Sequence, residues 1–234
     1  MKGKISVIIP TLNEESHITI CLNSVFQQDN SLIEEIIVAD GYSTDNTVNI
    51  AKKFNVKIVL GGIPGIARNN GAKAANGNYL LFLDADTILP PQFLKHAIFL
   101  FEKKNLIIAS FYLTPTTNSI FAKIILKGYN TIASFFASWL PVFLTAGCCV
   151  LVTQTAHNTV GGFSNSVVVL EEYDYIQRIK KLGKFAVIPL NVITSTRRFQ
   201  RGRCLQQTIV LFIYYFQWFF TRKISTDRFG YWIR

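Results

Sequence analysis

The sequence predicts an α/β protein with three layers, in which helices cover both faces of a mostly parallel, Rossmann-like central sheet. Two observations lead to this fold class. Short β-branched runs alternate with amphipathic helical patterns through the first half of the chain, an order typical of βαβ units. Polar and acidic residues also gather where these runs end, which is typical of the carboxyl edge of a parallel sheet.

The β-branched runs and the helical patterns predict the individual elements in order. In the first half, strands are expected at 5–9, 35–39, 56–60 and 79–83, and helices at 15–27, 43–54 and 67–75. Ser43 is the expected N-cap of the second helix, after the turn pair Asp40-Gly41. In the less regular second half, helices are expected at 91–103 and 172–182, and strands at 106–113, 147–152 and 185–188.

Composition excludes several protein classes. With 234 residues, 50% of them hydrophobic and 16% charged, the chain can form a core and is not broadly disordered. Four scattered cysteines without CxxC spacing argue against a disulfide scaffold and a zinc module. The apolar run that follows Met1 is too short for a signal peptide. A reducing, cytosolic environment is therefore expected.

Acidic and polar residues directly follow three of the predicted strands. The first strand runs into residues 10–15 (PTLNEE), the second ends in Asp40, and the fourth runs into Asp84-Ala85-Asp86. These side chains are expected to face a common crevice, because parallel strands share a carboxyl edge. One alternative is that Asp40 and Asp84 only close turns or cap helices. Two carboxylates one residue apart favour instead a divalent cation, Mg²⁺ or Mn²⁺, shared with substrate phosphates.

Four motifs occur in the order found in a known enzyme family. They are VIIPTLNEE, VADGYSTDNT, GIARNNGAKAANGNYLLFLDADT, and VGGF followed by EEYDYIQRIKKLG. Together they resemble family 2 glycosyltransferases over roughly residues 4–200, and this resemblance implies the GT-A fold. It also implies transfer of a sugar, with inversion, from a UDP- or GDP-sugar donor. We therefore expect a GT-A domain over residues 1–200 and a basic, aromatic segment over 201–234.

The resemblance implies roles for residues at the strand ends. The segment that holds the base and ribose of the nucleotide corresponds to Pro10, Thr11, Asn13 and Glu14. Asp40 corresponds to the carboxylate that reads the edge of the base, and Arg68, in the loop after the third strand, meets the nucleotide. In the Asp-x-Asp pair around Ala85, Asp86 is the firmer metal ligand. Asp84 is closer to the ribose or to a metal-bound water.

The general base of the transfer is expected within residues 171–174. The family usually has Glu-Asp here, at the start of a helix that continues to an Arg and a Gly. Arg178 and Gly183 keep this spacing, so Glu172 takes the Asp position, and Glu171 stays an alternative. Such a base deprotonates the acceptor hydroxyl, while a metal and basic groups stabilise the departing nucleoside diphosphate. The simpler alternative is that these acids only complement a helix N-terminus.

Basic charge is concentrated at the end of the chain. Residues 178–234 hold 12 Lys and Arg and one acid, a net charge of +11, whereas residues 1–177 carry −1. Such a segment favours an anionic membrane surface, nucleic acid or a polyphosphate ligand. Within it, Arg197 and Arg198 of TSTRRF are expected to clamp the diphosphate, since guanidinium groups match phosphate oxygens. The alternative is a solvated basic loop.

Residues 204–221 carry no charge, are rich in aromatic side chains, and have basic residues at both ends. This pattern suits a helix lying in the interface of an anionic membrane. The inserting side chains would be Phe212, Phe216 and Phe219. A buried core helix and a single membrane span, for which the window is short, are the alternatives. We expect peripheral attachment at the cytoplasmic face of the cell membrane, next to a lipid-linked or glycan acceptor.

Three other functions were weighed against this one. A sugar nucleotidyltransferase would carry a Gly-rich phosphate loop with Arg after the first strand, where this chain has PTLNEE. A nucleic-acid-binding module could stack bases on the aromatic tail. That tail is too apolar, however, and its basic residues cluster at its ends, so nucleic acid is not expected. A non-catalytic binder of nucleotide sugars would not need the acids at Asp84, Asp86 and residues 171–174.

Overall fold

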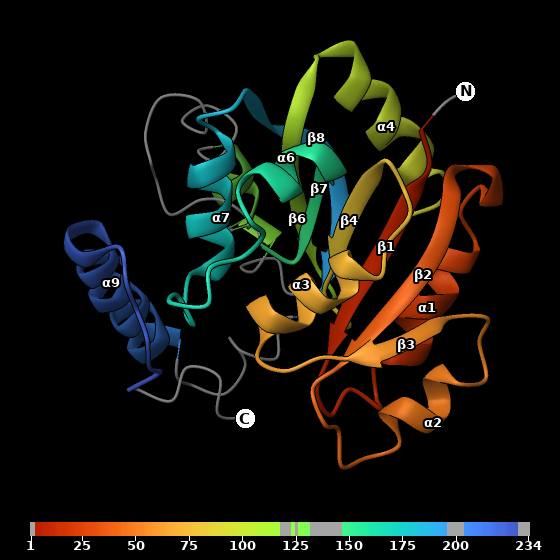
Figure 1. The fold of residues 1–234 in the computed structure, drawn as a ribbon, viewed down its shortest axis with the longest axis horizontal. Helices are drawn as coiled ribbons and strands as arrows, with labels where there is room; N and C mark the ends of the chain where they lie inside the picture. The colour runs from red at the N-terminus through yellow and green to blue at the C-terminus, as the bar shows by residue number, and fades with distance from the viewer. Residues whose placement is uncertain (1–2, 118–122, 125, 132–146, 196–203, 229–234) are drawn as a thin grey trace.

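The computed structural model describes residues 3–117, 123–124, 126–131, 147–195 and 204–228, and within them it contains one eight-stranded sheet. The strand order is β3-β2-β1-β4-β7-β6-β8-β5 (Figure 1). The strands are β1 (Ile5–Thr11), β2 (Ile33–Asp40), β3 (Lys57–Leu60), β4 (Tyr79–Leu83), β5 (Thr87–Ile88), β6 (Leu106–Pro115), β7 (Cys149–Thr153) and β8 (Lys184–Thr194). Strands β1 to β4 are parallel, as are β6 and β8, whereas β7 is antiparallel to β4 and β6, and β5 to β8. The mostly parallel sheet is confirmed, and each of its antiparallel pairs involves β7 or β8.

Helices cover both faces of this sheet (Figure 1). They are α1 (Ile18–Phe26), the 3₁₀ helix η1 (Asn30–Leu32), α2 (Thr47–Ala51), α3 (Pro64–Lys73), α4 (Phe93–Lys103), α6 (Gln154–Thr159), α7 (Glu171–Ile179) and α9 (Cys204–Thr221). Alternation along β1 explains the layers. Val7 and Ile9 pack in one core with α1 and α4, while Ile8 points to a second core with α3 and α7. The predicted three-layer α/β class is confirmed.

Two local predictions were wrong, and each has a physical reason. Helix α2 begins at Thr47 rather than after Ser43, because Ser43 N and Oγ both donate to the Asp40 carboxylate and so close a turn instead. The last strand was expected to end at Ile188, before Pro189. Instead β8 continues to Thr194 through an irregularity in its pairing with β6 at this point.

Helix α9 lies beside α7, away from the sheet (Figure 1). Tyr214 and Trp218 on its inner face are buried in a small core with Tyr173 of α7. The segment after α9 also joins this core, since Ile224 N donates to Ser166 O at 2.8 Å. Over the residues that the structure describes, no helix has the length and apolar character needed to cross a membrane.

Candidate active site

A cavity of about 390 Å³ opens at the carboxyl edge of the parallel strands. Its walls come from the segments that follow β1, β2, β3 and β4, including the start of α3. The lining residues are Pro10, Thr11, Leu12, Glu14, Gly41, Tyr42, Gly62, Ile63, Pro64, Arg68, Asp84, Ala85 and Asp86. The structure thus brings together most of the expected site residues from three strand ends. Asn13 and Asp40 are not among the residues that line the cavity.

Arg68 connects this cavity to the acidic start of α7. The resemblance placed Arg68 in the loop after the third strand, whereas it lies within α3, in agreement with the helix expected at 67–75. Its guanidinium is 3% exposed and pairs with Asp84 at 2.8 Å, with Glu171 at 3.0 Å and with Glu172 at 2.8 Å. Burial opposes the charged form, but the three carboxylates outweigh it and raise the pKa of Arg68. One buried cation therefore joins three acids from two distant segments.

The two glutamates at the start of α7 differ in environment. The side chain of Glu171 is 1% exposed, and its Oε2 is buried without a hydrogen-bond partner. Burial first, and then the charge of Glu172, raise the pKa of Glu171 well above its ordinary value, despite Arg68. The shift favours the protonated form of Glu171. Glu172 keeps 17% of its side chain exposed.

Gly147 lies against the carboxylate of Glu172. A Cβ added at position 147 would lie 2.6 Å from Cδ and 2.8 Å from Oε1 of Glu172, closer than any real contact allows. A Cβ at position 147 would therefore displace the carboxylate end of Glu172. This contact and the Arg68 ion pair together define where the Glu172 carboxylate lies.

Asp40 organises the turn after β2. Its carboxylate accepts hydrogen bonds from Thr11 Oγ1 at 3.1 Å, from Ser43 N at 2.9 Å and from Ser43 Oγ at 2.6 Å. The residue is 8% exposed and sits behind the cavity lining. In this arrangement Asp40 ties the ends of β1 and β2 together.

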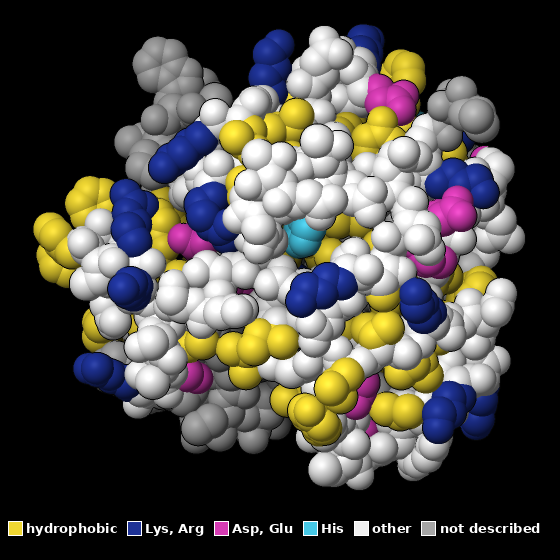
Figure 2. Space-filling view, in the orientation of Figure 1, with side chains coloured by type: hydrophobic (Ala, Val, Ile, Leu, Met, Phe, Trp, Pro, Cys, Tyr) yellow, Lys and Arg dark blue, Asp and Glu magenta, His cyan; other side chains and the backbone are white. Residues whose placement is uncertain are grey.

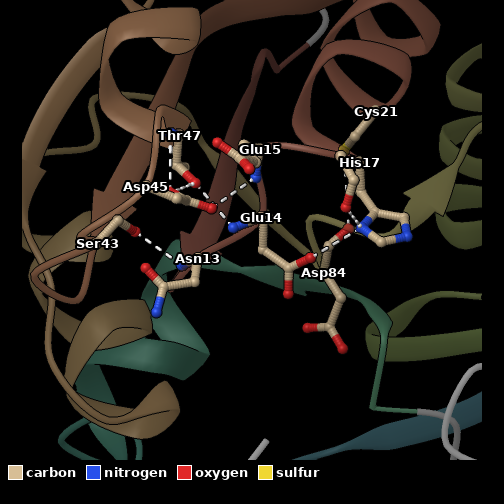
Figure 3. A network of polar contacts seen from close by, with 10 residues as sticks. Asn13, Glu14, Glu15, His17, Cys21, Ser43, Asp45, Thr47 and Asp84 are labelled. Atoms are coloured by element: carbon tan, nitrogen blue, oxygen red, sulfur yellow. Dashed lines mark hydrogen bonds and ion pairs between the residues drawn. The ribbon is translucent and has the colours of Figure 1, made fainter.

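The loops after β1 and β2 are cross-linked by a network of short polar contacts (Figure 3). Asn13 N donates to Ser43 Oγ at 2.8 Å, and Glu14 N donates to Thr47 Oγ1 at 2.7 Å. The buried Glu14 carboxylate lies 3.2 Å from the Nδ1 of His17. Asn13 therefore supports the wall of the cavity, whereas Glu14 both braces it and lines it.

The carboxylates of the cavity fit a magnesium or manganese ion that shares its shell with substrate phosphates. Asp84 and Asp86 line the same cavity. One cation, that of Arg68, pairs with Asp84 and also with Glu171 and Glu172. Such an ion is usually held by one or two carboxylates together with phosphates and water. In the described parts of the chain, no group of three His, Cys, Asp or Glu residues could hold an ion by protein ligands alone. A shared ion suits this donor set better than a closed protein cage.

Several lining residues were not foreseen from the sequence, namely Leu12, Gly41, Tyr42, Gly62, Ile63 and Pro64. The Gly-Gly-Ile-Pro run after β3 was a usable signal, since it marks a loop at the same sheet edge. Tyr42 lies within the motif VADGYSTDNT, but the resemblance implies no role for it. Arg197 and Arg198, expected at the diphosphate, lie outside the described residues.

Comparison with known proteins agrees with this architecture. The family model described as glycosyl transferase family 2 matches residues 6–160, a span that includes Asp84 and Asp86 and ends before α7. Poly(ribitol-phosphate) beta-N-acetylglucosaminyltransferase TarS of Staphylococcus aureus is 41% identical over 40% of this chain and 18% of that protein. A dolichyl N-acetyl-alpha-D-glucosaminyl phosphate 3-beta-D-2,3-diacetamido-2,3-dideoxy-beta-D-glucuronosyltransferase of Methanococcus voltae is 37% identical over 42% of this chain and 34% of that protein. The matches thus span a minor part of these relatives.

Solved structures share the fold. The mannosyltransferase PcManGT from Pyrobaculum calidifontis, in complex with GDP-Man and Mn²⁺, superposes with a TM-score of 0.73 at 19% identity. The match covers 93% of this chain and 64% of that one. TarS residues 1–349 in complex with UDP-GlcNAc give a TM-score of 0.67 at 22% identity, over 82% of this chain and 58% of that one. The expected GT-A fold is confirmed by these neighbours.

Proposed function

Because this chain belongs to glycosyl transferase family 2, we propose that it transfers a sugar from a nucleoside diphosphate sugar to an acceptor hydroxyl or phosphate group. One observation carries the proposal. Arg68 bonds to Asp84 on the cavity wall and to Glu172 on α7, at 2.8 Å each. A carboxylate suited to the donor and an acid suited to the acceptor thus share one buried cation. The complexes of TarS with UDP-GlcNAc and of PcManGT with GDP-Man support this donor class.

The donor would bind with its diphosphate near Asp84 and Asp86 and its nucleoside near Pro10, Thr11 and Glu14. Asp86 and Asp84 would hold a Mg²⁺ or Mn²⁺ ion together with the diphosphate. When bound, this ion would neutralise charge on the departing nucleoside diphosphate. In this proposal Asp40 acts on the nucleotide through the turn that it closes. Its carboxylate already accepts bonds from Thr11 and Ser43.

Glu172 is the proposed general base. It is more exposed than Glu171, at 17% against 1% of the side chain, so an acceptor hydroxyl has better access to it. Its carboxylate lies 2.8 Å from Arg68 Nη2, and a carboxylate held there can act as the base for a hydroxyl proton. Glu171 is instead a positioning residue, because its buried side chain pairs with Nη1 of Arg68, while Asp84 pairs with Nη2. Inversion at the anomeric carbon would follow from direct attack by the deprotonated hydroxyl.

Donor screening tests this proposal. The 234-residue chain is incubated with UDP-, GDP- and dTDP-sugars in Mn²⁺, and thermal stabilisation and release of the nucleoside diphosphate are recorded. We expect one nucleotide class to give both signals, and EDTA or Asp86→Ala to remove them. Glu34→Gln is the matched control, because Glu34 is a partly exposed carboxylate at the amino end of β2. Undiminished turnover in EDTA would contradict the proposed metal dependence. The absence of any signal with every donor would contradict the proposed transferase activity.

We further propose that α9 attaches the protein to an anionic membrane surface, where a lipid-linked acceptor could reach Glu172. The name of the Methanococcus voltae relative includes a dolichyl N-acetyl-alpha-D-glucosaminyl phosphate, which supports such an acceptor class. The outer face of α9 carries an exposed apolar strip, defined as Ile209, Ile213, Phe216, Phe219 and Phe220. Figure 2 shows hydrophobic side chains gathered over α9, with Lys and Arg side chains beside them. Phe212, another expected inserting residue, has a side chain outside those described.

Charge makes an anionic lipid surface the fitting partner for the strip. Residues 178–234 carry a net charge of +11, and Arg222 and Lys223 at the end of α9 are exposed. Each basic side chain near such a surface contributes about 1 kcal/mol to the free energy of binding, and salt weakens this attraction. Inserted phenylalanines add a contribution that does not depend on salt. The inner face of α9 is already packed on α7, so the outer strip can insert without unfolding the helix.

Co-sedimentation with anionic vesicles at low and high salt tests the membrane proposal. High salt should weaken but not abolish binding. Replacing Phe216, Phe219 and Phe220 together by Ser should remove the salt-resistant part and leave the melting temperature unchanged. Neutral vesicles serve as the control surface. If the triple variant unfolds, α9 is a core helix. If wild-type protein stays bound to vesicles in both high salt and carbonate, α9 spans the membrane.

A further inference from the structure

Tyr42 combines a strained backbone with an exposed aromatic ring. Its φ of 66° lies in the left-handed region, which a residue other than glycine adopts only at a cost in free energy. The residue is 69% exposed, so its ring contributes little to the core. A side chain that neither suits its backbone nor packs in the core is a candidate for direct contact with a ligand.

Neighbouring contacts hold Tyr42 in this conformation. On one side, Gly41 N donates to Thr11 O at 2.7 Å. On the other side, Ser43 N donates to Asp40 Oδ2 at 2.9 Å. The turn therefore imposes a left-handed φ at position 42, where glycine would fit with less strain. A tyrosine at this position points to a function of its ring.

The place of Tyr42 in the cavity indicates which part of a nucleotide it would meet. Tyr42 follows β2, and it lines the cavity together with the exposed side chains of Leu12, after β1, and Ile63, after β3. Asp84 and Asp86 follow β4, which lies on the opposite side of β1 from β2. The lining is therefore aromatic and aliphatic toward β3 and acidic toward β4. A nucleoside diphosphate has the same polarity, with an aromatic base at one end and a metal-binding diphosphate at the other.

We propose that the ring of Tyr42 stacks on the nucleobase of the donor. This inference rests on the proposed function, since it takes a nucleoside diphosphate sugar as the donor. Every nucleobase offers a π face, so stacking adds affinity without selecting the base. Tyr42 should therefore contribute equally to the binding of uridine and guanosine nucleotides, while other residues select between them.

Calorimetric titration of the full chain with UDP, GDP and inorganic pyrophosphate, each with Mg²⁺, tests the stacking. Tyr42→Gly removes the ring and relieves the backbone, whereas Tyr42→Phe keeps a ring. We expect Tyr42→Gly to raise the dissociation constants of UDP and GDP about tenfold. Its pyrophosphate affinity should be unchanged and its melting temperature should not fall. Tyr42→Phe should bind all three ligands like the wild type.

Phe99→Ala is the matched control, because Phe99 is also largely exposed, at 59%, and lies on α4 outside the cavity lining. It should change none of the three affinities. The inference is overturned if Tyr42→Gly binds UDP and GDP as tightly as the wild type. It is equally overturned if pyrophosphate binding weakens as much as UDP binding, since the ring would then only shape the loop. A folded wild-type protein that binds neither nucleotide would instead refute the proposed function itself.

Discussion

The two walls of the candidate active site are built in different ways. The loops after β1 and β2 are held to each other by many short bonds between neighbouring strand ends, among them Asn13 N to Ser43 Oγ and Glu14 N to Thr47 Oγ1. The acids of α7 come from far along the chain and do not line the cavity themselves. The described ion pairs of Glu171 and Glu172 all converge on Arg68, which does line it. One wall is braced redundantly, and the other is joined to it through one side chain.

This difference separates binding from chemistry in the proposed enzyme. Loss of one bond among the strand-end loops leaves several others, so the nucleotide wall should tolerate single changes. Loss of Arg68 would leave three carboxylates without the charge that holds them at 2.8 to 3.0 Å. Changes at the α7 wall should therefore be felt strongly, and in turnover more than in nucleotide affinity.

Arg68→Met is expected to have the largest effect. Removing one partner of a buried ion pair typically costs about 3–5 kcal/mol, because the remaining charges are buried and unpaired. Urea unfolding should show a loss of that size, and turnover should disappear. Adding Glu171→Gln should restore part of the stability, since it removes one of the stranded acids. Arg178→Met is the control, because its described ion pair involves one carboxylate, that of Asp174, and its side chain is 28% exposed. A loss at Arg68 no larger than at Arg178 would contradict the bridging role.

Glu172→Gln should lower turnover about 10²-fold or more while nucleotide binding persists, because glutamine cannot accept the proton. Glu171→Gln should cost much less, since burial already raises the pKa of Glu171 and favours its protonated form. Gly147→Ala should give an intermediate loss, as its Cβ would displace the Glu172 carboxylate. Steady-state kinetics paired with nucleotide titration separate the cases. If Glu171→Gln lost more turnover than Glu172→Gln, Glu171 would be the general base and Glu172 the positioning residue.

The strand ends of the parallel sheet were more predictable than the α7 wall, because their signals are local in sequence. The strand at 79–83 was predicted with its observed bounds, and Asp84 and Asp86 follow it directly. A buried β-branched or apolar run followed by polar residues identifies both the strand and its carboxyl edge. For this reason the resemblance and the strand pattern led to the same residues.

The α7 wall could be predicted only in part, because its geometry depends on contacts between distant residues. Arg68 is separated by 16 residues from Asp84 and by 103 from Glu171, so no local pattern reveals that they pair. Packing of α9 on α7 was likewise one of three readings of an apolar run. The loops after β1 and β2 also departed from prediction where hydrogen bonds compete, since Ser43 closes a turn on Asp40 instead of capping α2.

Acid should lower the free energy of unfolding, because His157 packs against α7 in its neutral form. This residue is buried, and its Nδ1 lies 2.7 Å from the hydroxyl of Tyr175 on α7. Burial, and then the charge of Arg178, lower the pKa of His157 from 6.5 to about 4. The unfolded chain therefore takes up this proton first, so the contribution to stability is present above pH 6.5 and is lost as the pH falls toward 4. Linkage gives a loss of roughly 2 kcal/mol between pH 7.5 and 5.

Urea unfolding at pH 7.5 and pH 5 measures this loss. In His157→Gln the loss between the two pH values should be smaller by that amount. His96→Gln is the control, since His96 lies exposed on α4 and should leave the pH dependence as in the wild type. Equal pH dependence in wild type and His157→Gln would mean that His157 is not held neutral.

The smallest effect is expected where α7 meets α9. Trp218 Nε1 donates to Asp174 Oδ1 at 3.1 Å, and Arg178 Nε donates to the other oxygen at 2.7 Å. Trp218→Phe keeps an aromatic ring but removes one of these donors, so it should cost about 1–2 kcal/mol of stability. Asp174 remains paired with Arg178 and α7 stays anchored, so turnover should fall less than threefold. Phe220→Leu, on the exposed strip, should change neither quantity in the absence of membranes. A large loss of turnover in Trp218→Phe would mean that α9 positions Glu172 as strongly as Arg68 does. The α7 wall would then depend on two elements rather than on Arg68 alone.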